Sequence, residues 1–104
     1  MRIERIEQVP LEGAEGVAMA AVDGSTSAER LQVHLAVLEP GSSLPRHPAG
    51  LHQTFYVLHG AGRIAGDDDV EVPISEGWAA VWETGEQHTF WADTRMEVVI
   101  VQRG

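Results

Sequence analysis

The sequence predicts an all-β protein, built as a small barrel or sandwich, from the way its residues are patterned. Eleven glycines and five prolines interrupt the chain at short intervals. No stretch keeps a helical apolar period over three turns, whereas several segments alternate with a period of two. Many short strands at regular spacing are typical of β-sandwiches and small barrels. Because 104 residues is the size of one domain, residues 1–104 are expected to form a single unit.

The expected strands follow one another along the chain. They cover residues 2–6, 16–22, 31–38, 55–58, 63–65, 70–74, 78–82 and 96–101. Segment 31–38 is the clearest, because Leu31, Val33, Leu35 and Val37 share one face and predict a half-buried strand. Residues 66–69 form a strong turn signal. Only residues 27–30 could start a helix, and they run directly into the next strand.

Composition and charge exclude several classes of function. The net charge is −9 and the seven basic residues, all arginines, are scattered, so no basic patch for nucleic acid or an anionic membrane is predicted. The absence of cysteine excludes disulfides, thiol catalysis and cysteine-ligated metals. The chain has no apolar run of about 18 residues, as a membrane span requires, and its charged first residues do not resemble a signal peptide. We therefore expect a cytoplasmic protein.

Histidines are the most informative polar residues. They are His34, His47, His52, His59 and His88. Imidazole is the commonest ligand for transition metals and titrates near neutral pH. Two of them follow glycine turns, since Gly41 precedes His47 by six positions and Gly85 precedes His88 by three. This placement predicts two imidazoles near the mouth of a barrel.

Residues 41–60 resemble the first motif of the cupin family. That motif runs glycine, five residues, histidine, one residue, histidine, three or four residues, glutamate, six residues, glycine. Gly41, His47 and Gly60 fall on this spacing. Ala49 stands where the second histidine would be, and Gln53 stands where the glutamate would be.

Residues 77–92 resemble the second cupin motif, which runs glycine, five residues, proline, one residue, glycine, two residues, histidine, three residues, asparagine. Gly77, Gly85 and His88 match it, whereas Glu83 replaces the proline and Ala92 the asparagine. Together the two motifs cover about half of the chain. The resemblance implies a small jelly-roll barrel, also called a double-stranded β-helix.

The resemblance also implies a divalent metal, held by three histidines and one glutamate. This chain keeps His47 and His88 of that set. Gln53 could coordinate through its carbonyl oxygen, although a neutral amide attracts a cation less than a carboxylate does. His52 could replace the missing histidine only if a bulge near Gly50 turned it inward, because neighbouring strand residues point to opposite faces. The implied metal is zinc, iron, manganese or nickel, and a metal-free pocket is the alternative.

Aromatic and aliphatic side chains are expected around this pocket. Phe55 and Val57 share the strand face of Gln53, so they should line the barrel interior. Trp82 and Phe90 are expected to shape the pocket wall, with plain packing as the alternative for each.

The strand face that points away from the barrel interior suggests that two copies of the chain associate. Tyr56 and Leu58 point away from the interior, and with residues such as Val33 and Val99 they leave an apolar face that needs a cover. Small cupins commonly cover it by pairing two barrels, so the resemblance implies a homodimer. His34 would either line the cavity or lie at a subunit contact.

Two functions are compatible with these features. The first is a metal-dependent enzyme of the dioxygenase, isomerase or decarboxylase type, in which His47, His88 and Gln53 hold the metal and leave positions open for a small organic substrate. The second is a non-catalytic barrel that binds or senses a small molecule and is metal-free because its ligand set is incomplete.

Overall fold

The computed structural model describes residues 1–25 and 27–104. Within these residues the chain forms eleven β-strands and no helix. The strands are β1 (Arg2–Arg5), β2 (Val9–Pro10), β3 (Ala18–Met19), β4 (Leu31–Leu38), β5 (Ser43–Pro48), β6 (His52–His59), β7 (Ala61–Ala65), β8 (Val72–Ser75), β9 (Trp78–Trp82), β10 (Gln87–Ala92) and β11 (Met96–Arg103).

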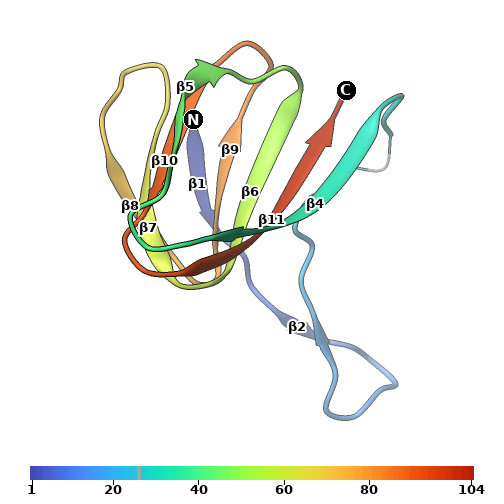
Figure 1. Cartoon of the computed structure of the whole chain (residues 1–104). Coiled ribbons are helices and arrows are strands. Elements are labelled where there is room, and N and C mark those ends of the chain that lie inside the picture. Colours follow the sequence, from blue (N-terminus) through green and yellow to red (C-terminus); the bar gives the residue numbers. More distant parts are fainter. Residues whose placement is uncertain (26) are drawn as a thin grey trace.

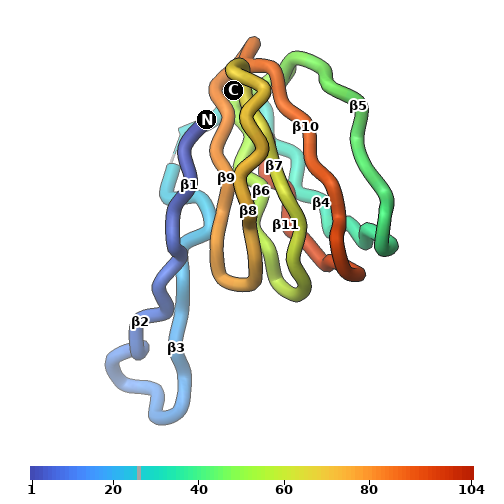
Figure 2. Tube along the Cα trace, turned by 90° about the vertical axis from the view of Figure 1, so that its left-hand side faces the viewer, coloured from blue at the N-terminus to red at the C-terminus, as the bar shows by residue number. Residues whose placement is uncertain are grey.

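Two antiparallel sheets face each other across the core (Figure 1). The five-stranded sheet has the order β1-β9-β6-β11-β4, and the four-stranded sheet has the order β5-β10-β7-β8. A separate hairpin of β2 and β3 projects away from this body in both views (Figures 1 and 2). The predicted all-β jelly-roll class is confirmed.

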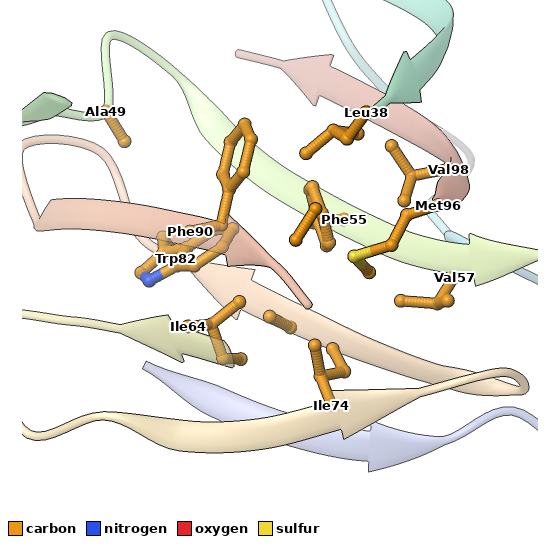
Figure 3. Close-up of a cluster of buried hydrophobic side chains, with 12 residues drawn as sticks. Leu38, Ala49, Phe55, Val57, Ile64, Ile74, Trp82, Phe90, Met96 and Val98 are labelled. Atoms are coloured by element: carbon orange, nitrogen blue, oxygen red, sulfur yellow. The ribbon is translucent and has the colours of Figure 1, made fainter. Parts of the chain in front are cut away.

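The core fills the space between the two sheets (Figure 3). Its buried members are Leu38, Ala49, Phe55, Val57, Ile64, Ile74, Ala80, Trp82, Phe90, Ala92, Met96 and Val98. The ring of Phe55 lies 4.8 Å from that of Phe90 and 6.1 Å from that of Trp82, measured between centroids. Aromatic contacts of this kind join the two sheets, because Phe55 and Trp82 come from one and Phe90 from the other.

The outer face of β4 differs from the prediction. The exposed fractions are 55–77% at the four positions Leu31, Val33, Leu35 and Val37. Leu38, whose side chain points to the other face of the strand, is buried. The expectation of a half-buried apolar face at these four positions is therefore wrong. Alternation shows which residues share a face, but it does not show which face the opposing sheet covers. On this edge strand the covered face is the one that carries Leu38.

Three elements were not predicted from the sequence. β2 is a two-residue strand, and β5 and β10 are rich in polar residues and, in β5, proline. Proline is compatible with β5 because this strand lies at a sheet edge. The helix start considered at residues 27–30 does not form. All four residues are described and none is helical, and the backbone N–H groups of Glu29 and Arg30 donate to the carbonyl oxygen of Gly104.

Candidate functional site

The structure brings His47 and His88 together. They lie directly opposite each other on the neighbouring antiparallel strands β5 and β10, with ring centroids 4.2 Å apart and ring planes inclined by 58°. A glycine turn sets up this pairing: Gly85, at a φ of 85°, donates its N–H to the carbonyl oxygen of Ala49 at 2.7 Å. The two imidazoles are 41 positions apart in sequence and adjacent in space.

An acidic turn holds both histidine-bearing strands from outside. The guanidinium of Arg46 donates to the carbonyl oxygens of Gly66 and Asp67, each at 2.8 Å. The carboxylate of Asp67 accepts a hydrogen bond from the backbone N–H of Gln87 at 2.7 Å. Each of these contacts is made by the residue preceding a histidine, so turn 66–69 fixes β5 and β10 at the level of His47 and His88.

His88 is the buried member of the pair. It is 2% exposed, and its Nδ1 has no hydrogen-bond partner among the described residues. Burial, and after it the neighbouring charge of His47, lowers the pKa of His88 below its ordinary value of 6.5. The ring is therefore neutral at physiological pH and offers a nitrogen lone pair to a ligand.

His47 is the exposed member. Its Nδ1 lies 2.7 Å from the carbonyl oxygen of Pro45. A carbonyl can only accept, so Nδ1 donates its proton there. In the neutral ring, Nε2 is then left with a free lone pair. This backbone contact orients the ring in the way that supporting hydrogen bonds orient histidine ligands in metal sites.

The opposite sheet supplies a polar row at the same level. Gln53 of β6 is paired with Trp82 of β9 on one side and with Gln102 of β11 on the other. The Nε2 of Gln102 donates to the Oε1 of Gln53 at 3.3 Å. The ring of Trp82 lies 4.9 Å from that of His88, and its Nε1 has no hydrogen-bond partner in the described residues. Gln102 was missed in the sequence, although it is the one polar residue on the strand face that it shares with Met96, Val98 and Ile100.

The structure does not bring His52 to this group. His52 is paired with Arg103, one position from the Gln53–Gln102 pair, so it points to the opposite face of the sheet. Its Nε2 lies 3.5 Å from Nη2 of Arg103 and 3.7 Å from Oε1 of Glu83. No bulge turns this ring toward His47 and His88, because the register is unbroken between His52 and Gln53.

The four residues expected around the pocket lie in the packed core. Phe55, Val57 and Trp82 are fully buried and Phe90 nearly so. They contact one another and the rest of the core (Figure 3). Of the four, Trp82 also contacts the histidine pair, through His88.

The donors present fit a tightly held transition metal poorly. Such metals usually take three or four protein ligands. The described residues contain no group of three or more histidine, cysteine, aspartate or glutamate side chains close enough to hold a metal. His47 and His88 supply two nitrogen donors, and the amide oxygen of Gln53 already accepts a hydrogen bond.

Comparison with models of protein families identifies the family of this chain. The family described as cupin domain matches residues 34–102. This range includes His47, His88 and most strands of both sheets. The chain belongs to the cupin family. A comparison with curated proteins finds no match.

Solved cupin structures resemble the chain over different shares of their lengths. A cupin superfamily protein from Desulfitobacterium hafniense has a TM-score of 0.67 at 14% identity, covering 96% of this chain and 98% of that one. A protein described as a predicted oxalate decarboxylase from Thermotoga maritima has a TM-score of 0.63 at 28% identity, covering 68% and 64%. Salicylate 1,2-dioxygenase from Pseudoaminobacter salicylatoxidans has a TM-score of 0.64 at 19% identity, covering 70% of this chain and 20% of the enzyme. This cupin chain therefore spans only part of the last two proteins.

In the described part of this cupin, no helix is long and apolar enough to cross a membrane.

Proposed function

We propose that this cupin binds a small organic molecule at the site formed by His47, His88 and Trp82, without a resident metal. The observation that supports this most directly is that, among the residues that the structure describes, Nδ1 of His88 and Nε1 of Trp82 have no hydrogen-bond partner, although the two side chains lie in contact. Each buried polar group without a partner costs about 1–3 kcal/mol. A ligand that pairs with them would recover that free energy.

The chemistry of these groups suggests the kind of ligand. The indole Nε1 of Trp82 can only donate, so it would bind an acceptor oxygen such as a carbonyl, hydroxyl or carboxylate. The neutral ring of His88 can donate or accept according to its tautomer. Three buried polar side chains, Gln53, Trp82 and His88, together with the exposed ring of His47, therefore favour a small polar molecule with at least one oxygen acceptor.

Binding can be tested with the molecules named for the neighbouring structures, oxalate, salicylate and gentisate. Saturation-transfer NMR and intrinsic tryptophan fluorescence are the measurements, on wild-type protein and on His88→Ala. The control is His59→Ala, because His59 is an exposed histidine at the far end of β6. We expect binding of at least one probe to be lost in His88→Ala and kept in His59→Ala. Equal binding by both variants would contradict the proposed site.

A metal-dependent enzyme is the second candidate, and the oriented ring of His47 next to His88 favours it. In that case the two imidazoles would hold a divalent zinc, iron, manganese or nickel ion, which would supply Lewis-acid chemistry.

Elemental analysis after loading with each ion separates the two candidates. One equivalent of metal, lost in His47→Ala and in His88→Ala but kept in His59→Ala, would favour the enzyme. No stoichiometric metal under any loading condition, with organic binding intact, would favour the binding barrel.

A further inference from the structure

Four polar side chains form a row across the five-stranded sheet, on the neighbouring strands β4, β11, β6 and β9 (Figure 1). Gln32 lies opposite Gln102, and Gln102 lies opposite Gln53. Gln53 in turn lies opposite Trp82. Directly paired residues of an antiparallel sheet point to the same face, so these four side chains, here called the polar row, share one face. Three of the chain's five glutamines belong to it.

The polar row lies on the inner face of the sheet. Gln53 alternates with Phe55 and Val57, which belong to the buried core. Gln32 is six positions from Leu38 on the same strand, so it shares the face of that buried residue. The row therefore faces the side of the barrel on which the His47–His88 pair lies.

Exposure to solvent falls along the row. Gln32 is exposed, Gln102 is partly buried, Gln53 is 4% exposed and Trp82 has no exposed surface. The opposing sheet leaves this end of β4 open, since His34, on the same face as Gln32, is also exposed. Three strand spacings of about 4.8 Å make the row about 14 Å long. It connects the solvent with the site at which Trp82 contacts His88.

The polar row offers more hydrogen-bonding groups than its own members pair. Each glutamine amide has two N–H donors and one acceptor oxygen. Among the described residues, the row contains one side-chain hydrogen bond, from Nε2 of Gln102 to Oε1 of Gln53 at 3.3 Å. Nε1 of Trp82 has no partner in the same part of the chain. Donors and acceptors are therefore both available to a ligand along one line.

The polar row carries no formal charge. A carboxylate placed beside the buried Gln53 would lose its hydration without meeting an opposite charge in the row. Arg103, next to Gln102 in sequence, points to the outer face and donates to Asp23 at 2.8 Å. Arg30 lies before β4 begins, at the exposed rim, where its backbone pairs with Gly104. The inner part of the row therefore favours an uncharged ligand.

We propose that the polar row binds a neutral polyhydroxylated molecule, a sugar or a polyol. Its hydroxyl groups would pair with the three amides, and its innermost oxygen would accept from Nε1 of Trp82. A hydroxyl group both donates and accepts, as an amide does, so successive hydroxyls match successive amides. This inference rests on the proposed function, because it names the class of ligand for the same site.

The first test compares ligands on the wild-type protein by saturation-transfer NMR. The neutral probes are myo-inositol and D-glucose. Cyclohexanol provides a ring with a single hydroxyl, and D-gluconate provides several hydroxyls together with a carboxylate. We expect a neutral probe to bind at least about threefold more tightly than either comparison ligand, as one additional hydrogen bond provides. Failure of both neutral probes to bind, or equal or tighter binding of cyclohexanol or D-gluconate, would overturn the proposal.

The second test removes single amides from the row. Gln32→Ala and Gln102→Leu should each weaken binding of the neutral probe about three- to tenfold, the effect of one lost hydrogen bond. The matched control is Gln8→Ala, because Gln8 is an exposed glutamine outside the row, and it should leave the affinity unchanged. Gln32 is also exposed, so Gln32→Ala should fold like the wild-type protein in circular dichroism melts. Unchanged affinity in both row variants would overturn the proposal.

His88→Ala separates failure of this inference from failure of the proposed function. Binding of a neutral probe that is lost in His88→Ala but unchanged in Gln32→Ala and Gln102→Leu would overturn the polar row and leave the site. Binding of salicylate that depends on His88, without binding of a neutral probe, would overturn the ligand class alone. Binding of a neutral probe that depends on both glutamines but not on His88 would overturn the proposed function.

Discussion

Truncation of Val57 to alanine distinguishes a packed barrel interior from a pocket lined by this residue. Val57 has no exposed surface and lies opposite Val98, which is also fully buried. Loss of two methyl groups costs about 1.6 kcal/mol at about 0.8 kcal/mol each. The void left between two stiff strands adds about 1 kcal/mol. We therefore expect the free energy of unfolding to fall by about 2–3 kcal/mol.

Urea denaturation followed by tryptophan fluorescence measures this loss. The matched control is Val70→Ala, the same truncation at a side chain that is 56% exposed, which should change stability by less than about 0.5 kcal/mol. Thermal melts should show the same contrast, with a Tm at least about 8 °C lower for Val57→Ala. A loss below about 1 kcal/mol at Val57, with an unchanged denaturant slope, would refute the packed interior and return Val57 to the wall of a cavity.

Two further perturbations test the site and the sheet that carries it. Because burial and the charge of His47 lower the pKa of His88, the unfolded chain binds this proton more readily, so stability should fall as the pH drops below 6.5 toward that lowered pKa. His88→Phe should flatten this part of the dependence of the free energy of unfolding on pH, and an unchanged slope in urea titrations would contradict the assignment. Gly62→Ala should destabilise the protein by more than about 2 kcal/mol, because the added Cβ would overlap the carbonyl oxygen of Trp91 and lie 2.8 Å from Sδ of Met96. Gly50→Ala, where a Cβ meets nothing within 4 Å, should be neutral or slightly stabilising in the same melts, and equal losses in both variants would count against the close approach at Gly62.

The alternation of apolar and polar residues predicted the apolar strands correctly and missed the polar ones. Segments 31–38 and 78–82 have the predicted bounds, because β-branched and large apolar residues dominate them. β5 and β10 were missed because they pair with each other, and β10 also pairs with β7, through contacts between residues far apart in the chain. Local propensity carries no information on such partners.

The candidate site was partly accessible from motif spacing. The spacing singled out His47 and His88, and alternation separated His52 from Gln53, as their pairing with Arg103 and Gln102 shows. The hydrogen bond between Gln102 and Gln53 joins residues 49 positions apart, so no local pattern reveals it. The metal ligation predicted for His47, Gln53, His88 and His52 remains a prediction.

The sequence by itself determined the all-β class, because strand periodicity and turn glycines are properties of neighbouring residues. Its two spaced motifs, at residues 41–60 and 77–92, carried the resemblance to the cupin family. Only the tertiary structure decided that His47 and His88 meet across β5 and β10, that Trp82 contacts His88 from the other sheet, and how far the apolar face of β4 is exposed. These outcomes depend on strand register and on where each sheet ends. Both are set by pairings between distant segments, so they cannot be determined from neighbouring residues.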